Sequence, residues 1–197
     1  MTTWIAVIVE TRDLPDFWAT ASRHGVVPLS QGVPKHVLID CGAGFDFHAP
    51  VQLAEALSRD TGGMAIGFLV QTNADVHELH AYQAGALVRR LQYSRDYGGW
   101  QAPEGSTQAW ERAYFFDDQR TTDGQWPSLL DDEATDDDVA RYEAAKRDGD
   151  ASPILDLIRP SSTIPMRRVC AFFGLTPEEP AARWKKPSFW SGLFSRK

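Results

Sequence analysis

Residues 64–71 have the sequence Met-Ala-Ile-Gly-Phe-Leu-Val-Gln, an apolar run of the length of a buried β-strand. Two further strand-like segments follow, Asp75–Gln83 and Ala86–Ser94, and the pair Ala84-Gly85 between them is a hairpin signal. In the range Leu87–Tyr93, alternate side chains point to opposite faces, and one face is mostly apolar. This alternation predicts an antiparallel meander with one face exposed to water.

The residues before this meander alternate between strand and helix signals. Trp4–Glu10 and His36–Asp40 are short apolar runs typical of buried strands. Asp13–His24 and Val51–Arg59 are typical of helices, because capping or proline signals precede the first and glycines follow both. The order predicts an α+β fold with a single mixed, mostly antiparallel sheet and helices covering a face.

The second half of the chain carries weaker signals. Ala109–Phe116 is rich in aromatic residues, and we expect a further strand there. Residues 117–135 are rich in Asp, Thr, Gly and Pro and are interpreted as a loop. Asp136–Arg147 is predicted to be a polar helix, with acidic residues in its first turn and basic residues in its last. Ser162–Phe173 is predicted to be a C-terminal amphipathic helix that ends at Gly174.

The size and composition of the chain indicate one globular domain. The chain has 197 residues, of which 43% are hydrophobic, so it can bury a substantial core. We expect a single α+β domain at residues 1–175 and a C-terminal tail at residues 176–197. Two cysteines, Cys41 and Cys170, make no disulfide framework. The chain shows no signal peptide and no long apolar run, so a cytoplasmic location is expected.

The net charge of −7 is unevenly distributed along the sequence. Residues 116–150 hold 4 basic and 12 acidic residues, whereas residues 151–197 hold 8 basic and 3 acidic residues. Such a pattern argues against nucleic-acid binding, which requires a continuous basic surface. It is compatible with a protein partner that is steered by charge.

The acidic residues are densest in one short run, which comprises Asp131, Asp132, Glu133, Asp136, Asp137 and Asp138. A calcium loop is not predicted, because the glycine required at its sixth position is absent. Thr135 and Asp138 have the spacing of a capping box, so the run is typical of a solvated helix start. The alternative interpretation is an acidic surface that binds a basic partner.

A glycine turn at Gly42 and Gly44 follows the predicted strand His36–Asp40. In nucleotide-binding loops, such glycines allow the backbone to approach a ligand. Here the predicted helix does not begin directly after the glycines, and the next strand ends in Gln71 without an acidic residue. A tight turn is the simpler interpretation, and a ligand-binding enzyme is the alternative.

Other catalytic and metal-binding patterns are weak. His77 and His80 are three residues apart, which on a strand directs them to opposite faces. Cys41 and Cys170 do not lie in a nucleophile motif, and the chain has no Gly-x-Ser-x-Gly elbow. We therefore predict no catalytic residue, no metal site and no cofactor.

A cluster of aromatic and polar residues follows the meander. A Leu-x-Tyr strand ending at Tyr93 is followed by Asp96, a Gly-Trp pair ending at Trp100, and Gln-x-Trp-Glu at residues 108–111. In this feature the segment 64–116 resembles small uncharacterised bacterial proteins of the polymorphic-toxin immunity type. The resemblance implies a protein that binds and neutralises a toxin. On physical grounds, the two tryptophans Trp100 and Trp110 are expected to cover one end of the sheet.

The last fifteen residues, 183–197, alternate basic residues with aromatic ones, among them Trp184 and Trp190. This composition is typical of a segment bound at a membrane surface. It is equally typical of a peptide that docks on a partner. A third interpretation is that the tail folds back and that its charges pair with the acidic region 117–138.

These patterns favour a non-catalytic protein that binds another protein, with toxin immunity as the most concrete version. The expected partner is basic, such as a toxin domain, and the acidic run together with Trp184 and Trp190 would contact it. The alternatives are an enzyme that uses the Gly42/Gly44 turn and a peripheral membrane protein held by its tail.

Overall fold

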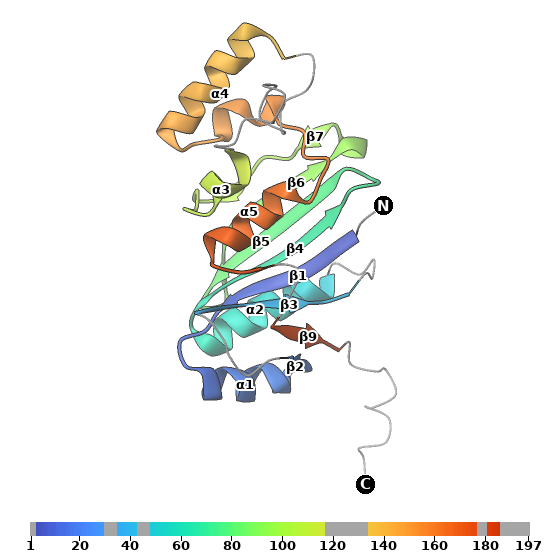
Figure 1. Cartoon of the computed structure of the whole chain (residues 1–197), viewed down its shortest axis with the longest axis vertical. Coiled ribbons are helices and arrows are strands. Elements are labelled where there is room, and N and C mark those ends of the chain that lie inside the picture. The colour runs from blue at the N-terminus through green and yellow to red at the C-terminus, as the bar shows by residue number, and fades with distance from the viewer. Residues whose placement is uncertain (1–2, 30–34, 43–47, 117–133, 177–180, 186–197) are drawn as a thin grey trace.

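One sheet runs through the molecule, and helices pack on both of its faces (Figure 1). The structure is a computed structural model that describes residues 3–29, 35–42, 48–116, 134–176 and 181–185. The strands are β1 (Thr3–Glu10), β2 (Val26–Pro28), β3 (His36–Asp40), β4 (Met64–Gln71), β5 (Val76–Gln83), β6 (Ala86–Ser94), β7 (Gly99–Trp100), β8 (Glu104–Gly105) and β9 (Ala182–Trp184). The helices are α1 (Leu14–Arg23), α2 (His48–Thr61), α3 (Glu111–Phe115), α4 (Asp136–Asp148) and α5 (Ile164–Phe172), with 3-10 turns η1 (Arg95–Tyr97) and η2 (Ser152–Leu157).

The strand order is β2-β9-β3-β1-β4-β5-β6-β7, and β8 pairs with β6 beside β7. All neighbouring strands are antiparallel except β3 and β9, which are parallel. The predicted α+β fold with a mixed, mostly antiparallel sheet is therefore confirmed.

The β5–β6 hairpin forms at the predicted turn. Ala84 and Gly85 have φ values of 49° and 82°, the left-handed region that a two-residue hairpin turn requires at both positions. The pairing shifts by one residue between Ala81 and Tyr82, which marks a β-bulge. The extra residue is Val88 on β6, which packs against the core of the face opposite α2.

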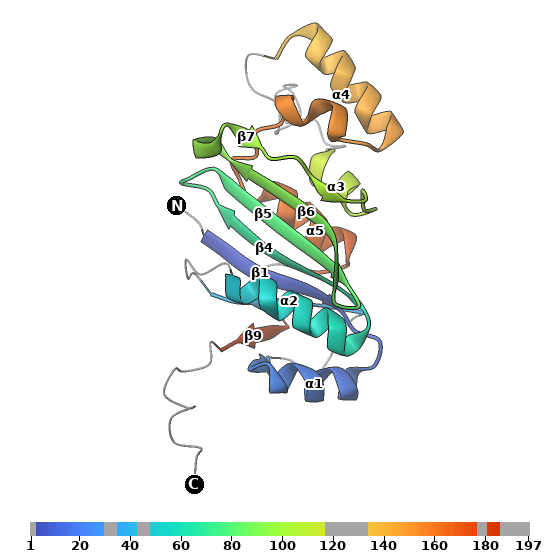
Figure 2. The ribbon, with the colours of Figure 1, turned by 180° about the vertical axis from the view of Figure 1, so that it is seen from behind.

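Each face of the sheet has its own core. On one face, α1 and α2 pack on Val7, Val9 and Val37 (Figure 2). On the opposite face, α3 and α5 pack on a larger cluster that includes Phe68 and Leu79, and α4 extends this cluster beyond the β7 edge, where it packs on η2. The strand alternation explains this division, since neighbouring residues of a strand point to opposite faces. We expected helices over one face, and the structure corrects this to both faces.

The segment Ala109–Phe116, expected to be a strand, contains helix α3. An aromatic run of this length suits either element, because periodicity alone does not separate a short buried helix from a strand. Two contacts fix the helix: Glu111 Oε1 accepts a hydrogen bond from the Gln108 backbone at 2.6 Å, and Tyr114 and Phe115 enter the core together. Trp110 is also buried there, and Trp100 packs against the same cluster.

The C-terminal segment contributes to the sheet. Residues 176–197 were expected to be a tail outside the domain, but Ala182–Trp184 forms strand β9 between β2 and β3. Ala182 is fully buried among the core residues of the α2 face. The domain therefore includes these residues, and the boundary expected at residue 175 is corrected. Among the described residues, no helix combines the length and the apolar character needed to cross a membrane.

Candidate functional site

A cleft of about 710 Å³ opens at the end of the sheet formed by η1 and β7. One wall is the continuous segment 98–103, and the other is formed by residues 155–161 around the end of η2. Asp75, Tyr93 and Arg95 complete the lining. The volume lies within the range of about 300–1,000 Å³ that is usual for ligand pockets.

Trp100 joins the two walls of the cleft. Its indole N–H donates a hydrogen bond of 2.8 Å to the backbone carbonyl of Ile158. Its ring centroid lies 5.3 Å from that of Tyr93 and 5.4 Å from that of Phe115, so the ring is held by aromatic neighbours. The Trp100 ring on the wall of the cleft is therefore fixed in position.

The rim beside β7 presents an exposed aromatic ring and a cation. Tyr97 is 80% exposed, which is unusual for an aromatic side chain of this size. Arg95 is also exposed and lies 3.4 Å from the Asp75 carboxylate. The turn η1 ends at Gly98, whose φ of 82° is in the left-handed region that glycine adopts without strain.

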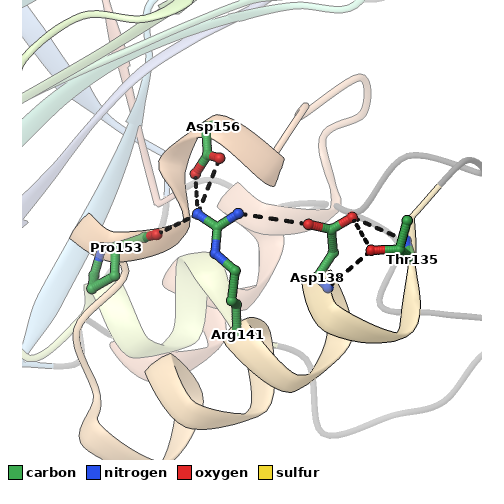
Figure 3. A network of polar contacts seen from close by, with 5 residues as sticks. All are labelled: Thr135, Asp138, Arg141, Pro153 and Asp156. Carbon is green, nitrogen blue, oxygen red and sulfur yellow. Dashed lines mark hydrogen bonds and ion pairs between the residues drawn. The ribbon is translucent and has the colours of Figure 1, made fainter.

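The opposite wall is tied to the start of α4 through Arg141 (Figure 3). Arg141 Nη2 lies 2.9 and 3.0 Å from the two carboxylate oxygens of Asp156, a residue that lines the cleft. Arg141 Nη1 lies 3.6 Å from Asp138 Oδ1 in the first turn of α4. Nη2 also donates to the carbonyl of Pro153 at 2.9 Å. One guanidinium thus connects two carboxylates and fixes η2 to α4.

The first turn of α4 contains the predicted capping box. The Thr135 hydroxyl accepts a hydrogen bond from the Asp138 backbone N–H, and the Asp138 carboxylate accepts bonds from the Thr135 N–H and hydroxyl. The hydrogen bonds from Thr135, with a smaller effect of Arg141, lower the pKa of Asp138. This carboxylate therefore has an internal structural role.

The residues of the acidic run differ in exposure and in their contacts. Asp136 and Asp137 are exposed, whereas Asp138 is half-buried and engaged with Thr135 and Arg141. Asp131, Asp132 and Glu133 lie outside the described residues. Of the acidic residues that the structure describes here, Asp136 and Asp137 are the two oriented toward solvent at the start of α4.

Trp184 belongs to the sheet at the opposite end of the molecule from α4 (Figure 1). It is half-buried, and its indole N–H donates to the backbone carbonyl of His24 at 3.1 Å. The neighbouring Arg183 lies 3.8 Å from Asp40. The described part of the tail thus packs on its own domain, far from the start of α4. Trp190 lies outside the described residues.

The glycine turn after β3 is only partly described. The Gly42 backbone N–H donates to Asp40 Oδ1 at 2.8 Å, which closes a short turn. Helix α2 begins at His48, six residues after Gly42. Gly44 lies outside the described residues.

The two histidines of β5 point to opposite faces of the sheet. His77 is fully buried, and its Nδ1 lies 2.7 Å from the Tyr114 hydroxyl. Burial lowers the pKa of His77 to about 3. Burial, Arg90 and His48 lower the pKa of His80 to about 4. Both rings are neutral at pH 7, and no group of three metal-ligating side chains forms among the described residues.

The cysteines are poor nucleophiles in this environment. Burial, with a smaller effect of Asp40, raises the pKa of the Cys41 thiol to about 12. Cys170 is buried in the core. Because the thiolate is the reactive form of cysteine, Cys41 is unreactive near neutral pH.

A buried ion pair lies between β6 and α3. Arg89 Nη2 lies 2.8 Å from Glu111 Oε2, and the two side chains are 7% and 3% exposed. Arg89 Nη1 also donates to the Gly105 carbonyl at 2.9 Å. The pair therefore connects β6, β8 and α3, and it anchors the segment that continues from the cleft wall.

Sequence reasoning identified one wall of the cleft and missed the other. The aromatic cluster around Trp100 was noted, but no element was predicted for residues 148–161. The available signal was Pro153 directly after Ser152, since proline favours the first turn of a helix. The contact between this turn and Trp100 joins residues 58 positions apart and has no local signal.

Comparison of the chain with models of known protein families, with curated proteins and with solved structures gives no match.

Proposed function

We propose that this protein binds another protein and neutralises or regulates it, without catalysis of its own. The observation that supports the proposal is the exposed ring of Tyr97 in the turn that leads into a cleft lined by Arg95 and Trp100. Tyr, Trp and Arg are the residues most enriched among the energetic centres of protein interfaces. An exposed tyrosine and arginine beside a tryptophan ring that is held in place favour binding of a macromolecular surface.

The charge at this end of the molecule favours a basic partner. The charged residues that line the cleft balance, since Asp75 and Asp156 are matched by Arg95 and Arg159. The excess negative charge lies beside the cleft at the start of α4, where Asp136 and Asp137 are exposed. Surface charge of one sign accelerates association with a partner of the opposite sign.

Toxin immunity is the most concrete version of this function. The resemblance of residues 64–116 to the immunity type supports it, and that segment includes one wall of the cleft. A basic toxin, such as a nuclease domain, fits the negative charge of the site.

The test measures the binding of this protein to basic nuclease toxin domains and the inhibition of these domains. We expect binding that weakens as salt is raised, because the steering charges are exposed. The double variant Asp136→Asn/Asp137→Asn should reduce the association rate constant by roughly tenfold. The control variant Glu143→Gln/Asp148→Asn removes the same charge farther along α4 and should have a smaller effect. If no such toxin domain binds to this protein or is inhibited by it, the toxin-immunity proposal is wrong.

A further inference from the structure

Strands β2 and β9 lie at the end of the sheet opposite α4 (Figure 1). Val27 of β2 lies opposite Arg183 of β9, and Arg183 lies beside Asp40 of β3, so these three side chains share one face of the sheet. Val26 and Ala182 point the other way, into the core beneath α1 and α2. Among the described residues, neither β2 nor β9 contributes to the core under α3 and α5.

The face that carries Val27 and Arg183 combines exposed apolar and basic side chains. Val27 and Leu29 are 38% and 51% exposed, and Leu29 continues the ladder by donating its backbone N–H to the Ala181 carbonyl at 3.0 Å. Arg183 and Lys185 are exposed as well. This combination suits the interface of a membrane, because Lys and Arg keep their charge in water while their aliphatic stems cover apolar surface.

The chain continues from this face into a basic and aromatic segment, residues 186–197. The start of the segment is fixed to the domain, because the Lys185 backbone N–H donates to the Gly25 carbonyl at 2.9 Å and the Trp184 indole donates to the His24 carbonyl at 3.1 Å. Residues 183–197 contain five basic residues and no acidic residue. Such a concentration of positive charge attracts a segment to anionic lipid headgroups.

The apolar residues of the segment are spaced in a way that favours a surface with one apolar side. Phe189, Trp190, Leu193 and Phe194 have the spacing of one face of a helix. Large apolar residues on one face, together with Lys and Arg, are typical of segments that lie in a membrane interface. A peptide that docks in a protein groove has a similar pattern. The exposed basic face beside the segment favours the membrane, since one extended surface can contact both.

We propose that residues 186–197 and the exposed face of β2 and β9 together bind the surface of a membrane that contains anionic phospholipids. Both supply apolar and basic groups at the same end of the molecule. The exposed carboxylates of Asp136 and Asp137 lie at the opposite end, away from the lipid charge (Figure 1). In this orientation the cleft beside β7 points away from the membrane and stays open to a protein partner.

The test measures sedimentation of the full chain with vesicles of phosphatidylcholine, alone or with about one third phosphatidylserine. We expect a partition coefficient at least roughly tenfold higher on the phosphatidylserine vesicles, since each basic residue near an anionic surface contributes a factor of about five. Trp190→Ser/Phe194→Ser and Arg196→Gln/Lys197→Gln should each lower it by about tenfold. The control Lys146→Gln/Arg147→Gln removes the same charge at the end of α4 and should change it by less than about twofold.

Two results would overturn membrane binding. One is that the wild type does not sediment with phosphatidylserine vesicles. The other is that the Trp190→Ser/Phe194→Ser variant sediments as well as the wild type. The segment would then be a candidate for docking on a protein. Binding to toxin domains is measured without vesicles, so the failure of either binding activity does not decide the other.

A fluorescent label tests the proposed orientation. Leu29→Cys and Glu143→Cys each place an exposed thiol at one end of the molecule, whereas Cys170 is buried. An environment-sensitive label at position 29 should shift its emission to shorter wavelength on addition of phosphatidylserine vesicles, and a label at position 143 should not. Equal shifts at the two positions, or a shift at position 143 alone, would show that the face of β2 and β9 is not the membrane-binding side.

Discussion

The carboxylate of Glu111 lies 2.8 Å from the guanidinium of Arg89, and the two side chains are 3% and 7% exposed. The pair connects a strand of the sheet with the short helix α3. Burial raises the pKa of Glu111, and the hydrogen bond from Arg89 opposes that shift. The cost of desolvating the two charges is offset only while both are present.

Removal of one partner should therefore destabilise the protein strongly. We expect Arg89→Met or Glu111→Leu alone to lower the free energy of unfolding by about 3–5 kcal/mol, because the other charge stays buried without its partner. The double variant Arg89→Met/Glu111→Leu should regain much of this loss. Urea unfolding of the wild type, the two single variants and the double variant measures the coupling energy between Arg89 and Glu111. If the loss in the double variant equals the sum of the two single losses, this prediction is contradicted.

The buried His77 should make stability depend on pH in a defined direction. Burial lowers the pKa of His77 from the usual 6.5 of a histidine side chain to about 3, so the fold favours the neutral ring. This contribution is fully present above pH 6.5 and is lost as the pH falls toward 3, with a slope of up to about 1.4 kcal/mol per pH unit. His77→Phe should give a flatter profile of unfolding free energy between pH 6.5 and 4. An unchanged profile would show that the ring is protonated in the fold.

His80 provides the matched comparison for this pH effect. Burial, Arg90 and His48 lower its pKa from the usual 6.5 to about 4. Its contribution to the free energy of unfolding is therefore also lost as the pH falls, but over a narrower pH interval. His80→Gln should reduce the acid slope less than His77→Phe. A larger effect of His80→Gln would show that His80, and not His77, makes the larger contribution to the pH dependence of stability.

Gly105 and Gly98 have similar φ values, 79° and 82°, but different surroundings. A Cβ atom on Gly105 would lie 2.1 Å from the carbonyl oxygen of Val88, whereas one on Gly98 would meet nothing within 4 Å. Gly98→Ala should lower the free energy of unfolding by about 1–2 kcal/mol, the strain of a left-handed alanine. Gly105→Ala should lower it by more, because the added Cβ should also force β8 away from β6. Circular dichroism during thermal unfolding compares them, and equal melting temperatures would contradict the steric argument.

The capping box at the start of α4 should contribute measurable local stability. Thr135→Ala removes the hydroxyl that accepts from the Asp138 N–H and should destabilise the helix by about 1 kcal/mol. Thr135→Ser keeps an equivalent oxygen and serves as the control. Hydrogen exchange of the α4 amides should accelerate in the alanine variant and stay near the wild-type rate in the serine variant.

The sequence predicted the elements that depend on local signals. The hairpin at Ala84-Gly85 and the helix start at Thr135 were predicted because their turn and cap residues act within a few positions. The strand predicted at Ala109–Phe116 was wrong, since an aromatic run suits a short helix as well. Strand β9 was missed because its partners β2 and β3 lie far away in the chain.

The candidate site was predictable only in part. Trp100 stood out in the sequence as an aromatic residue after a glycine pair. Its bond to Ile158, which shapes the cleft, depends on tertiary packing. Likewise, the sequence did not show that Arg141 would join the acidic helix start to Asp156.

The position of β9 in the sheet sets an order of events during synthesis. β2 pairs with β9 among the described strands, and the Trp184 indole that holds this corner reaches a carbonyl 160 residues earlier in the chain. At about 5–20 residues per second, the ribosome needs about 8–30 s to make that intervening chain. Throughout that interval, β2 and the outer edge of β3 are made but lack their partner strand. Among the described strands, the outer edge of β3 in such a nascent chain is closed when β9 is made, so this edge is open to other strands until then.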